Sequence, residues 1–461
     1  MTVTQYDVVV LGAGVAGGHI ASRCSEAGLS VALLEHDGFG GTCPLRGCEP
    51  KKVLADAAHT AERLLNGAGR GVTGSARLDW RELMAFKRTF TEGLPDRIRR
   101  YYEKKGIATY TEAGKFAGPD TIACGGRLLK ARHICITTGA ATRRLDIPGA
   151  DLLVTSRRFL ELDVMPERVV FIGGGFIACE LAHIAAVAGA DVSVVVRSDR
   201  LLRQFDAELV DRLREHLTGL GITFHMNCPP HRVLADSGSG KGTGKSMGGG
   251  MELHAGDGRF AADLIINASG RVPALEHLDL AVGGVRTEQG RGSGGIIVDS
   301  QLRSVSNPVV YAAGDVVRRG MPLTPVASVQ AEVVVRNILE GGGHAVEDNV
   351  TPYALFTYPP LAAVGMLEEE ARNSGRSFDI VSGDAASWSE YRRIGQTCAG
   401  FRLFVEKGSR LLLGAHVLGD GAEEMVNLFA LAMRKRVTVD ELQSMLWAYP
   451  SFGYALKYMF R

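Results

Sequence analysis

The chain has 461 residues, of which 46% are hydrophobic and 58 are glycine. This length exceeds one ordinary hydrophobic core, so two or three domains are expected. The 52 lysines and arginines nearly balance the 51 aspartates and glutamates, which argues against a charged surface for nucleic acid or an anionic membrane.

The first strand and the cysteine count give expectations about the environment of the protein. A strand that begins near Tyr6 leaves no room for a signal peptide, and no apolar run reaches the length of a membrane span. Eight cysteines in so long a chain are not typical of a secreted disulfide framework. We therefore expect the reducing cytoplasm, where a cysteine pair is more often catalytic than structural.

Residues 6–35 have the pattern of a dinucleotide-binding unit. A buried strand over 6–11 leads into a glycine turn, a helix to about residue 27 and a second strand over 30–34. Glycines let the backbone approach a pyrophosphate at the helix N-terminus, and an acid at the second strand end binds ribose hydroxyls. The residues predicted to serve the nucleotide are Gly12, Gly14, Gly17 and Glu35.

Two cysteines, Cys43 and Cys48, follow within the segment GFGGTCPLRGCEPKK of residues 38–52. On one helix their sulfurs would lie little more than a turn apart, so a modest adjustment would bring them within disulfide distance. Nearby cations could hold one sulfur as a reactive thiolate. A zinc half-site and a pair of buried apolar cysteines stay open as alternatives.

A second dinucleotide unit begins about 160 residues after the first, with a strand over 168–172 and a helix that ends at residue 187. Its turn carries Gly173 and Gly175. The second strand, over 192–196, ends in Arg197 rather than an acid, and Arg203 follows six residues later. Guanidinium groups match a 2′-phosphate, which favours NADPH over NADH, although a solvated surface role is the alternative. Two dinucleotides in one chain indicate an electron relay.

The pattern GGTC-x4-GC-x-PKK after such a fingerprint resembles the pyridine nucleotide-disulfide oxidoreductases, the group of glutathione reductase, dihydrolipoamide dehydrogenase and mercuric reductase. The resemblance runs along nearly the whole chain. It implies an α/β fold with two Rossmann-like, three-layer dinucleotide-binding domains and an α+β C-terminal dimerisation domain. The implied domains are an FAD-binding domain over 1–150 and 271–349, an NADPH-binding domain over 151–270 and a dimerisation domain over 350–461.

The resemblance also implies roles for individual residues. FAD would occupy the first site, with Cys48 as the charge-transfer sulfur and Cys43 as the sulfur that exchanges with substrate. Lys51 would lie beside the flavin, paired with Glu180, and Phe176 would cover the nicotinamide pocket. Further cofactor contacts are implied for Gly41, Thr42, Thr138, Gly139, Gly270, Arg271, Gly314, Asp315 and Ala327.

The C-terminal segment departs from the family pattern. The family's His-Pro segment with a Glu five residues beyond the His is replaced here by Tyr449, Pro450 and Tyr454. A phenol with a pKa near 10 is a poor base, and loss of a tuned imidazole costs about 10²–10⁴ in proton-transfer steps. We therefore expect slow turnover of glutathione-like disulfides, unless Tyr449 only packs. Ser22, in place of a substrate-binding arginine, and the lack of a C-terminal vicinal cysteine pair also disfavour glutathione and mercuric ion.

Arg46 is a second departure. It follows Cys43 by three residues, which would place both side chains on one helical face. One hypothesis is that Arg46 lowers the pKa of Cys43 and partly replaces the missing imidazolium. The alternative is a surface ion pair between Arg46 and Glu49 that contributes little energy.

The sequence thus predicts a homodimer in which NADPH reduces FAD, FAD reduces the Cys43–Cys48 disulfide, and the dithiol reduces a small disulfide or runs in reverse. In the resembled family, the last segment of each subunit completes the other's active site. Two alternatives are an NADPH-dependent quinone or metal-ion reductase that works from the flavin, and a redox-sensing flavoprotein. No resident metal, nucleic-acid or membrane partner is expected, and Cys124, Cys135 and Cys179 are expected to be packing residues.

Overall fold

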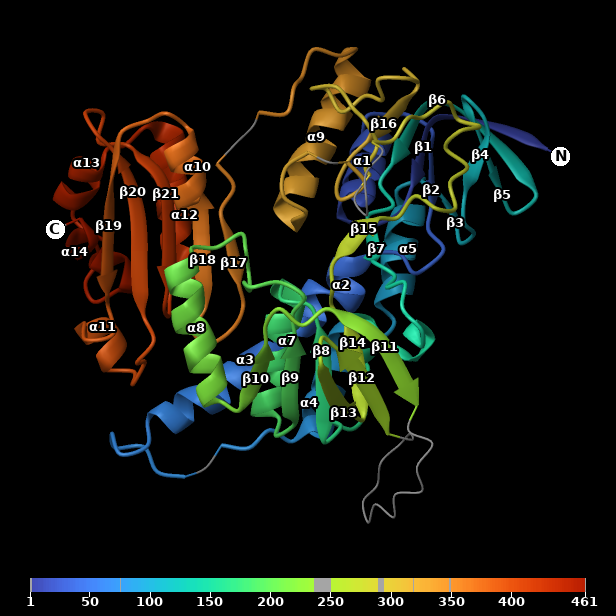
Figure 1. The fold of residues 1–461 in the computed structure, drawn as a ribbon. Coiled ribbons are helices and arrows are strands. Elements are labelled where there is room, and N and C mark those ends of the chain that lie inside the picture. Colours follow the sequence, from blue (N-terminus) through green and yellow to red (C-terminus); the bar gives the residue numbers. More distant parts are fainter. Residues whose placement is uncertain are drawn as a thin grey trace. The chain divides into compact units, whose positions relative to one another are not determined.

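The structure is a computed structural model that describes residues 2–74, 76–235, 250–288, 294–317, 319–347 and 350–460 (Figure 1). The chain forms two compact units, each built from three separate stretches of sequence. Unit 1 comprises Met1–Pro50, Phe86–Arg143 and Gly270–Asp348, and unit 2 comprises Lys51–Ala85, Arg144–Ser269 and Asn349–Arg461. Residues 237–250 are rich in Gly, Ser and Lys, a composition that predicts a loop, and they lie outside the described residues except for the last one.

A seven-stranded sheet organises unit 1, in the order β3-β2-β1-β6-β5-β4 with β16 beside β6. Parallel pairing joins β1 to β2 and β6, and β16 to β6, whereas β4, β5 and β6 pair antiparallel. The strands are β1 (Val3–Leu11), β2 (Val31–Leu34), β3 (Ala108–Tyr110), β4 (Lys115–Gly118), β5 (Thr121–Cys124), β6 (Arg127–Ile136) and β16 (Val310–Ala312). A two-stranded ribbon of β7 (Ala140–Thr142) and β15 (Arg271–Pro273) is also part of this unit.

Both faces of this sheet are buried, which explains the continuous apolar run of β1. Successive side chains of a strand point to opposite faces, so Val8 and Val10 belong to one core and Val9 and Leu11 to another. The helices of unit 1 are α1 (Val15–Glu26), α2 (Thr42–Arg46), α5 (Leu94–Lys104) and α9 (Thr324–Glu340), and α1 packs against α9. The boundary between the units falls within α3 (Cys48–Asn66) and α4 (Trp80–Thr91).

Unit 2 contains a second parallel sheet, in the order β10-β9-β8-β14. Its strands are β8 (Arg168–Ile172), β9 (Asp191–Val195), β10 (Ile222–His225) and β14 (Leu264–Asn267), and α7 (Phe176–Val187) packs against β8, β9 and β10. Further elements are α6 (Ser156–Phe159), α8 (Ala207–Gly219), the short 3-10 helix Ala150–Leu152, and an antiparallel sheet of β11 (Pro230–Ala235), β12 (Met251–Ala255) and β13 (Gly258–Ala262).

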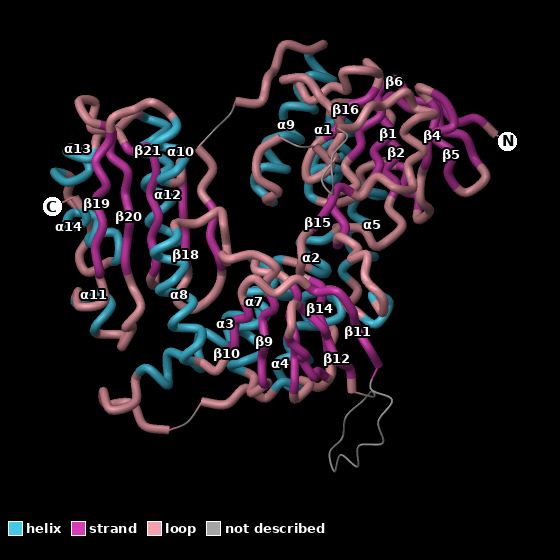
Figure 2. The backbone as a smooth tube through the Cα atoms, viewed as in Figure 1, coloured by secondary structure: helices cyan, strands magenta, loops and turns pink. Residues whose placement is uncertain are grey.

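The C-terminal part of unit 2 is an antiparallel five-stranded sheet, in the order β17-β18-β21-β20-β19 (Figure 2). Helix α12 (Ala422–Lys435) packs on β18 and β21. The strands are β17 (Tyr353–Leu355), β18 (Leu361–Gly365), β19 (Phe378–Asp384), β20 (Gly400–Glu406) and β21 (Leu412–Leu418); the remaining helices are α10 (Glu368–Asn373), α11 (Ser389–Arg392), α13 (Val439–Ser444), the 3-10 helix Phe452–Ala455 and α14 (Leu456–Met459).

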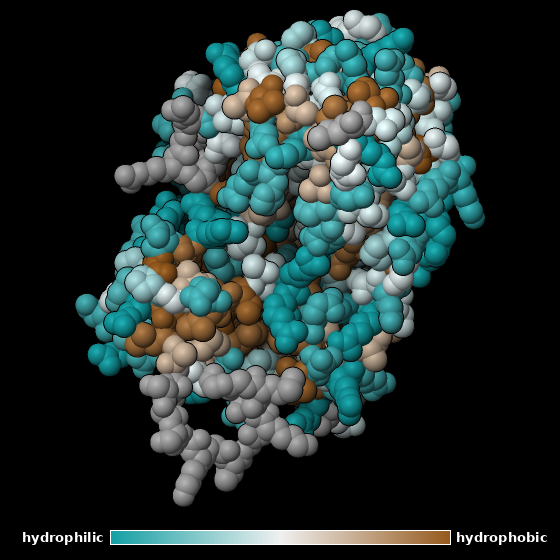
Figure 3. Space-filling view, turned by 90° about the vertical axis from the view of Figure 1, so that its right-hand side faces the viewer, coloured by the Kyte–Doolittle hydropathy of each residue, from teal (hydrophilic) through white to brown (hydrophobic). Residues whose placement is uncertain are grey.

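The predicted fold class is confirmed, because two parallel sheets with covering helices are followed by an α+β segment. Hydrophilic residues are spread across the face in Figure 3, with hydrophobic residues gathered in smaller patches between them. Among the helices of the described ranges, none is both long and apolar enough to cross a bilayer.

Candidate functional site

The first glycine turn, between β1 and α1, has three glycines with different packing. A Cβ on Gly12, where φ is +100°, would lie 2.6 Å from the carbonyl oxygen of Thr137, and a Cβ on Gly17 would lie 1.9 Å from the carbonyl oxygen of Gly12. A Cβ on Gly14 would meet only Cα of Gly41, at 4.0 Å. The outer surface of the turn is therefore left open by the protein, as close approach of a pyrophosphate requires.

Glu35, at the end of β2, braces this turn. Its carboxylate is 9% exposed and accepts hydrogen bonds from the backbone N–H of Ala13, at 3.0 Å, and of Asp37, at 2.8 Å. The two N–H groups bond different oxygens of Glu35, so each oxygen keeps a lone pair for a further donor. The geometry fits the predicted binding of ribose hydroxyls.

The two cysteines lie on different helices, so the expected single helix is corrected. Cys43 is in α2, which ends at Arg46; Gly47 interrupts the helical geometry, and Cys48 is the first residue of α3. Both cysteines are free thiols and are partly exposed. Thr324, the first residue of α9, has its hydroxyl oxygen 3.8 Å from Sγ of Cys48.

The two thiols interact strongly with one another. The hydrogen bond with Cys48 and then burial raise the pKa of Cys43 well above its usual range, with a smaller contribution in the same direction from the Glu49 charge and opposition from the Thr324 hydroxyl. The dithiol therefore retains a proton that the two sulfurs share, and the family resemblance assigns Cys48 as the sulfur that carries negative charge.

The predicted lowering of the Cys43 pKa by Arg46 is wrong for this geometry. The guanidinium of Arg46 forms an ion pair with Asp37, in which Nη2 and Oδ2 lie 3.0 Å apart, and its side chain is 16% exposed. The positive charge of Arg46 is thus paired with the carboxylate of Asp37, nine residues earlier in the chain. Because the Cys43 pKa is raised, Arg46 does not replace an imidazolium in the reduced pair.

The remaining residues predicted for the first site line the strand ends of unit 1. Burial raises the pKa of Asp315 and lowers that of Arg271, and the charge of each opposes the shift of the other. Arg271 donates a hydrogen bond to the carbonyl of Ala140, and Thr138 donates one to the carbonyl of Ala274 at 2.8 Å. Backbone of positive φ occurs at Gly41, Gly139, Gly270 and Gly314, Thr42 begins α2, and Ala327 is buried in α9.

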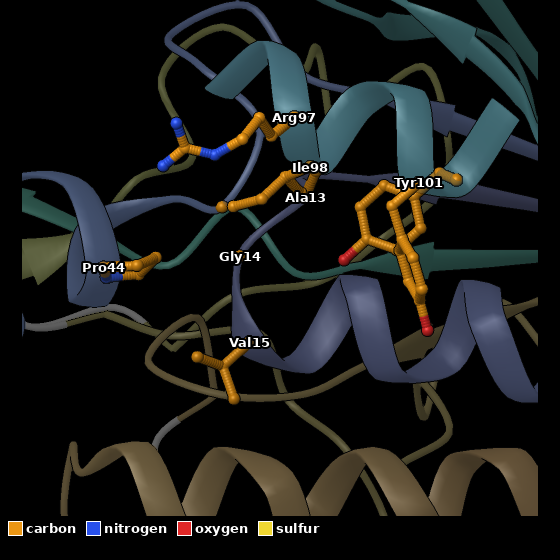
Figure 4. A pocket seen from close by; sticks show the side chains of 9 residues that line it. Ala13, Gly14, Val15, Pro44, Arg97, Ile98 and Tyr101 are labelled. Atoms are coloured by element: carbon orange, nitrogen blue, oxygen red, sulfur yellow. The ribbon is translucent and has the colours of Figure 1, made fainter. Parts of the chain in front are cut away.

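A cavity of about 380 Å³ opens beside the glycine turn in unit 1 (Figure 4). Pro44, which directly follows Cys43, lines it from α2, and Figure 4 shows the side chain of Arg97 extending from α5 toward that side. Ile98 and Tyr101 of α5 and Gly14 and Val15 of the glycine turn and α1 also line it. Sequence spacing gives no signal that α5 borders the cysteine helix α2.

The second glycine turn, between β8 and α7, repeats the first with one change. A Cβ on Gly173, where φ is +127°, would lie 2.3 Å from the carbonyl oxygen of Ala268, and a Cβ on Gly175 would have no neighbour within 4 Å. The third position is Ala178, which is fully buried. Phe176 begins α7, and its ring centroid lies 5.4 Å from that of Phe205.

Arg197 and Arg203 are both exposed near the end of β9. Arg203 pairs with Asp199 at 2.8 Å, but the two side chains are 66% and 69% exposed, so this ion pair is weak. No ion pair to Arg197 is found in the described part of the chain. Both guanidinium groups are thus accessible to an anionic ligand.

The structure brings Lys51 and Glu180 together within unit 2. Nζ of Lys51 lies 2.9 Å from Oε1 of Glu180, and that oxygen also accepts a hydrogen bond from the backbone N–H of Phe356 at 2.8 Å. The ammonium group lies 5.0 Å from the centroid of the Phe356 ring. Glu180 is 7% exposed, so its charge depends on these partners.

Tyr449 is 72% exposed and does not pack in the core of its own chain. Its ring lies 5.0 Å from that of Tyr454 in an edge-to-face arrangement, so the two tyrosines that replace the acid-base pair are neighbours. On the same segment Leu446 is 100% exposed and Met445 is 49% exposed. Large apolar side chains in such positions are typical of a surface that is covered in an assembly.

Comparison with known families places this geometry in context. The model of the pyridine nucleotide-disulphide oxidoreductase family matches residues 6–331, and the dimerisation domain of the same family matches residues 351–460. The chain belongs to this family. Pyridine nucleotide-disulphide oxidoreductases contain FAD, use NAD(P)H and act on sulfur groups, so the predicted enzyme class and cofactors are confirmed.

Individual relatives agree with this assignment over nearly the whole of this chain. A glutathione reductase of Burkholderia cepacia is 31% identical over 456 residues, which cover 97% of each chain. A mercuric reductase of Bacillus cereus is 29% identical, over 98% of this chain and 70% of the relative. The solved structure of RclA, an HOCl-induced flavoprotein disulfide reductase from Escherichia coli, has a TM-score of 0.86 at 25% identity and covers 99% of both chains; its Cu(II) complex has the same score and identity.

Proposed function

We propose that the protein is an NADPH:disulfide oxidoreductase that passes electrons through FAD to the Cys43–Cys48 pair and on to a small disulfide. The observation that carries this proposal is the hydrogen-bonded pair of thiols, Cys43 in α2 and Cys48 at the start of α3. Per turnover, NADPH and one proton from solvent reduce one disulfide to two thiols, and NADP⁺ is released. A reducing cytoplasm suits such a pair, because there its dithiol state is maintained.

The residues of unit 1 fit the FAD of the family. The uncovered backbone at Gly14, the buried carboxylate of Glu35 and the half-buried carboxyl of Asp315 supply a phosphate cradle and two hydroxyl acceptors. When bound, FAD supplies the two-electron link between the nicotinamide and the dithiol. We assign Lys51 and Glu180 to the flavin, as the family resemblance implies.

Reduction of the acceptor disulfide uses the two thiols in turn, first Cys43 and then Cys48. The sulfur of Cys43 attacks one sulfur of the substrate, the substrate S–S bond breaks, and the first thiol leaves with the proton from Cys43. The thiolate of Cys48 then attacks Cys43 in the mixed disulfide, which closes the Cys43–Cys48 bond and releases the second thiolate, protonated from solvent. Because Cys43 holds its proton strongly and no imidazole follows, disulfides with a low-pKa leaving thiol are favoured.

The second site and the oligomer complete the proposal. Exposed Arg197 and Arg203 beside the turn at Gly175 favour NADPH through its 2′-phosphate. The matched dimerisation domain supports a C2 homodimer, in which the segment with Leu446 and Tyr449 lies against the second copy.

Replacement of Cys43 tests the proposal. Cys43→Ser should lower the rate of disulfide-dependent NADPH oxidation at least 1000-fold, measured anaerobically with a panel of aliphatic, aromatic and anionic disulfides (order of magnitude from loss of a nucleophile). Cys124→Ala is the matched control, because the Cys124 thiol is also in unit 1 but is buried in β5. Equal disulfide turnover in the Cys43→Ser variant and the control would overturn the proposal.

A metal-ion reductase is the second candidate. Tyr449 and Tyr454 supply no acid-base pair for thiol chemistry, and RclA has been solved as a Cu(II) complex. No group of three or more His, Cys, Asp or Glu that could hold a metal occurs in the described ranges, so a metal ion would be substrate rather than resident cofactor. NADPH-dependent reduction of Cu(II) that survives in Cys43→Ser would favour this function.

A further inference from the structure

The segment that joins β9 to α8, residues 196–206, carries both arginines assigned to the 2′-phosphate and is called the arginine loop below. Its arginines are exposed to solvent, whereas its large apolar side chains are buried in unit 2. The exposed arginines are Arg197, Arg200 and Arg203, and the buried apolar residues are Val196, Leu201, Leu202 and Phe205. The loop therefore presents its cations on a packed apolar base.

Leu202 turns the arginine loop back onto the second glycine turn. Its φ is +43°, a conformation that is uncommon for residues other than glycine, and its side chain is 2% exposed. The backbone N–H of Leu202 donates to the carbonyl of Gly174 at 2.8 Å, and its carbonyl accepts from the backbone N–H of Phe205, also at 2.8 Å. A strained residue thus ties the loop to the turn that begins α7.

The ring of Phe205 joins the arginine loop to Phe176, the residue expected to cover the nicotinamide. Phe205 is 0% exposed, and its ring centroid lies 5.4 Å from that of Phe176 and 5.0 Å from that of Tyr353 in β17. The hydroxyl of Tyr353 donates to the carbonyl of Gln204 in the same loop. Protein interiors are packed as densely as organic crystals, so a shift of Phe205 is transmitted to the rings beside it.

Two cations of the arginine loop are held by groups that a phosphate can replace. Arg203 pairs with Asp199 at 2.8 Å in an exposed ion pair. Nη2 of Arg200 donates to the carbonyl oxygen of Phe205 at 3.2 Å. A phosphate oxygen is a stronger acceptor for a guanidinium group than a neutral carbonyl is. A 2′-phosphate bound beside these arginines therefore competes with the backbone of Phe205 for Arg200.

We propose that Phe205 couples the two ends of the nucleotide site, so that a 2′-phosphate at the arginine loop sets the position of Phe176 over the nicotinamide. This coupling rests on the proposed function, in which NADPH is the reductant. Phe205 is a positioning residue, because its buried ring acts through Phe176. Selection of NADPH over NADH then acts on the rate of flavin reduction as well as on affinity.

A packing role alone, in which Phe205 only fills the core, is the competing explanation. Phe205→Leu removes the ring that contacts Phe176 and keeps an apolar side chain. Phe159→Leu is the matched control, because Phe159 is also 0% exposed in unit 2, but its ring lies 5.8 Å from that of Trp80 and 6.0 Å from that of Phe171. Both variants are compared with wild type as full-length holoenzymes.

The first readout needs no turnover. A Phe176→Trp reporter is titrated with adenosine 2′,5′-bisphosphate, which has the 2′-phosphate but no nicotinamide, and with AMP, which lacks both. The signal of the protein without the reporter, which has three tryptophans, is subtracted. We expect the bisphosphate to change the fluorescence of the reporter, with or without Phe159→Leu, and AMP to leave it unchanged. With Phe205→Leu added, the bisphosphate should still bind more tightly than AMP but cause no change.

Three results of this titration would count against the coupling. An equal fluorescence change with and without Phe205→Leu would overturn it, because the signal would not pass through the Phe205 ring. Tight binding of the bisphosphate without a change in the parent reporter would overturn it as well. Equal affinities for the bisphosphate and AMP would show that the arginine loop recognises no 2′-phosphate, so that the preference for NADPH and the coupling fail together.

The second readout separates rate from affinity in protein with the native Phe176. In anaerobic stopped-flow reduction of the flavin, the limiting rate with NADPH should exceed that with NADH by about fivefold or more in wild type and in Phe159→Leu, a usual size for coupling between two sites. In Phe205→Leu the two limiting rates should become equal, while NADPH still saturates at a lower concentration than NADH.

The rate measurement has its own contradicting results. Equal limiting rates in wild type, or a ratio of rates that survives in Phe205→Leu, would overturn the coupling. If neither nucleotide reduces the flavin but the reporter still responds to the bisphosphate through Phe205, the proposed function fails and the coupling stands.

Discussion

The two glycine turns are alike at their first two glycines but differ at the third position, which is Gly17 in the first turn and Ala178 in the second. In both, the first glycine has positive φ, and a Cβ there would clash with a backbone carbonyl oxygen just after a neighbouring strand. That oxygen belongs to Thr137 for Gly12 and to Ala268 for Gly173. In both, the second glycine has almost no protein atom near it. The first glycine is thus required by the fold, whereas the second is left for the nucleotide.

The difference lies in how closely each helix approaches its turn. At Gly17 a Cβ would lie 1.9 Å from a backbone carbonyl, whereas the same position in the second turn already holds a buried Cβ, that of Ala178. The second strands differ as well: Glu35 is buried and braces the first turn, while Arg197 is exposed and braces nothing in the described part of the chain. From this contrast we expect the first turn to retain its cofactor and the second to bind a ligand that exchanges.

Exchange of the third residues tests this contrast most strongly. Gly17→Ala should cost at least about 3 kcal/mol of unfolding free energy and yield protein without FAD, because backbone atoms must move to relieve the clash. Ala178→Gly should cost only about 1 kcal/mol, from helix propensity, and keep both cofactors. Thermal unfolding and the flavin absorbance of purified protein measure both effects. Similar losses in the two variants would show that the turns do not differ as described.

The charges at the second strand ends provide the next largest effect. The double variant Arg197→Ser, Arg203→Ser should raise the KM for NADPH about 10–100-fold and leave the KM for NADH unchanged, since only the 2′-phosphate loses charge-assisted hydrogen bonds. FAD content should not change. Steady-state kinetics with both nucleotides give the answer, and a parallel rise in both KM values would contradict the assignment.

The third effect concerns the pH dependence of stability, and it comes from His59, a buried residue of α3 that lies outside both turns. The pKa of His59 is about 3 in the folded protein and near 6.5 when unfolded, so the unfolded chain binds the extra proton and stability falls as pH drops from 6.5 toward 3. His59→Phe should remove a loss of about 1.4 kcal/mol per pH unit over that window. Denaturant unfolding of both proteins at pH 7.5 and 5.5 measures it. If the stability of the variant depended on pH as strongly as that of wild type, the pKa of His59 would not differ between the folded and unfolded states.

Local patterns predicted the turns and most of the strands, because a glycine fingerprint between a strand and a helix is a short-range signal. The end of α7 at residue 187 follows in the same way from apolar spacing. The resemblance supplied the Lys51–Glu180 pair, whose residues are far apart in sequence. The resemblance thus predicted a contact that sequence spacing alone does not predict.

The errors and omissions were of a different kind. The break at Gly47 and the partner of Arg46, Asp37 in a preceding loop, depend on how two short helices meet. Arg97 reaches the cavity only because α5 packs beside α1 and α2. Glu62 of α3 contacts His183 of α7 and His216 of α8 only when all three helices are in place. Such arrangements come from tertiary packing, for which sequence periodicity carries no signal.

The central claim is that electrons pass through the Cys43–Cys48 pair, with Cys48 as the charged sulfur. Its most direct measurement is the long-wavelength absorbance of thiolate against oxidised flavin during anaerobic titration with NADPH. The band should appear in wild type after two electrons, be present in Cys43→Ser before any reductant is added, and be absent from Cys48→Ser. A wild-type protein without the band, or a Cys48→Ser variant that keeps it, would contradict the account.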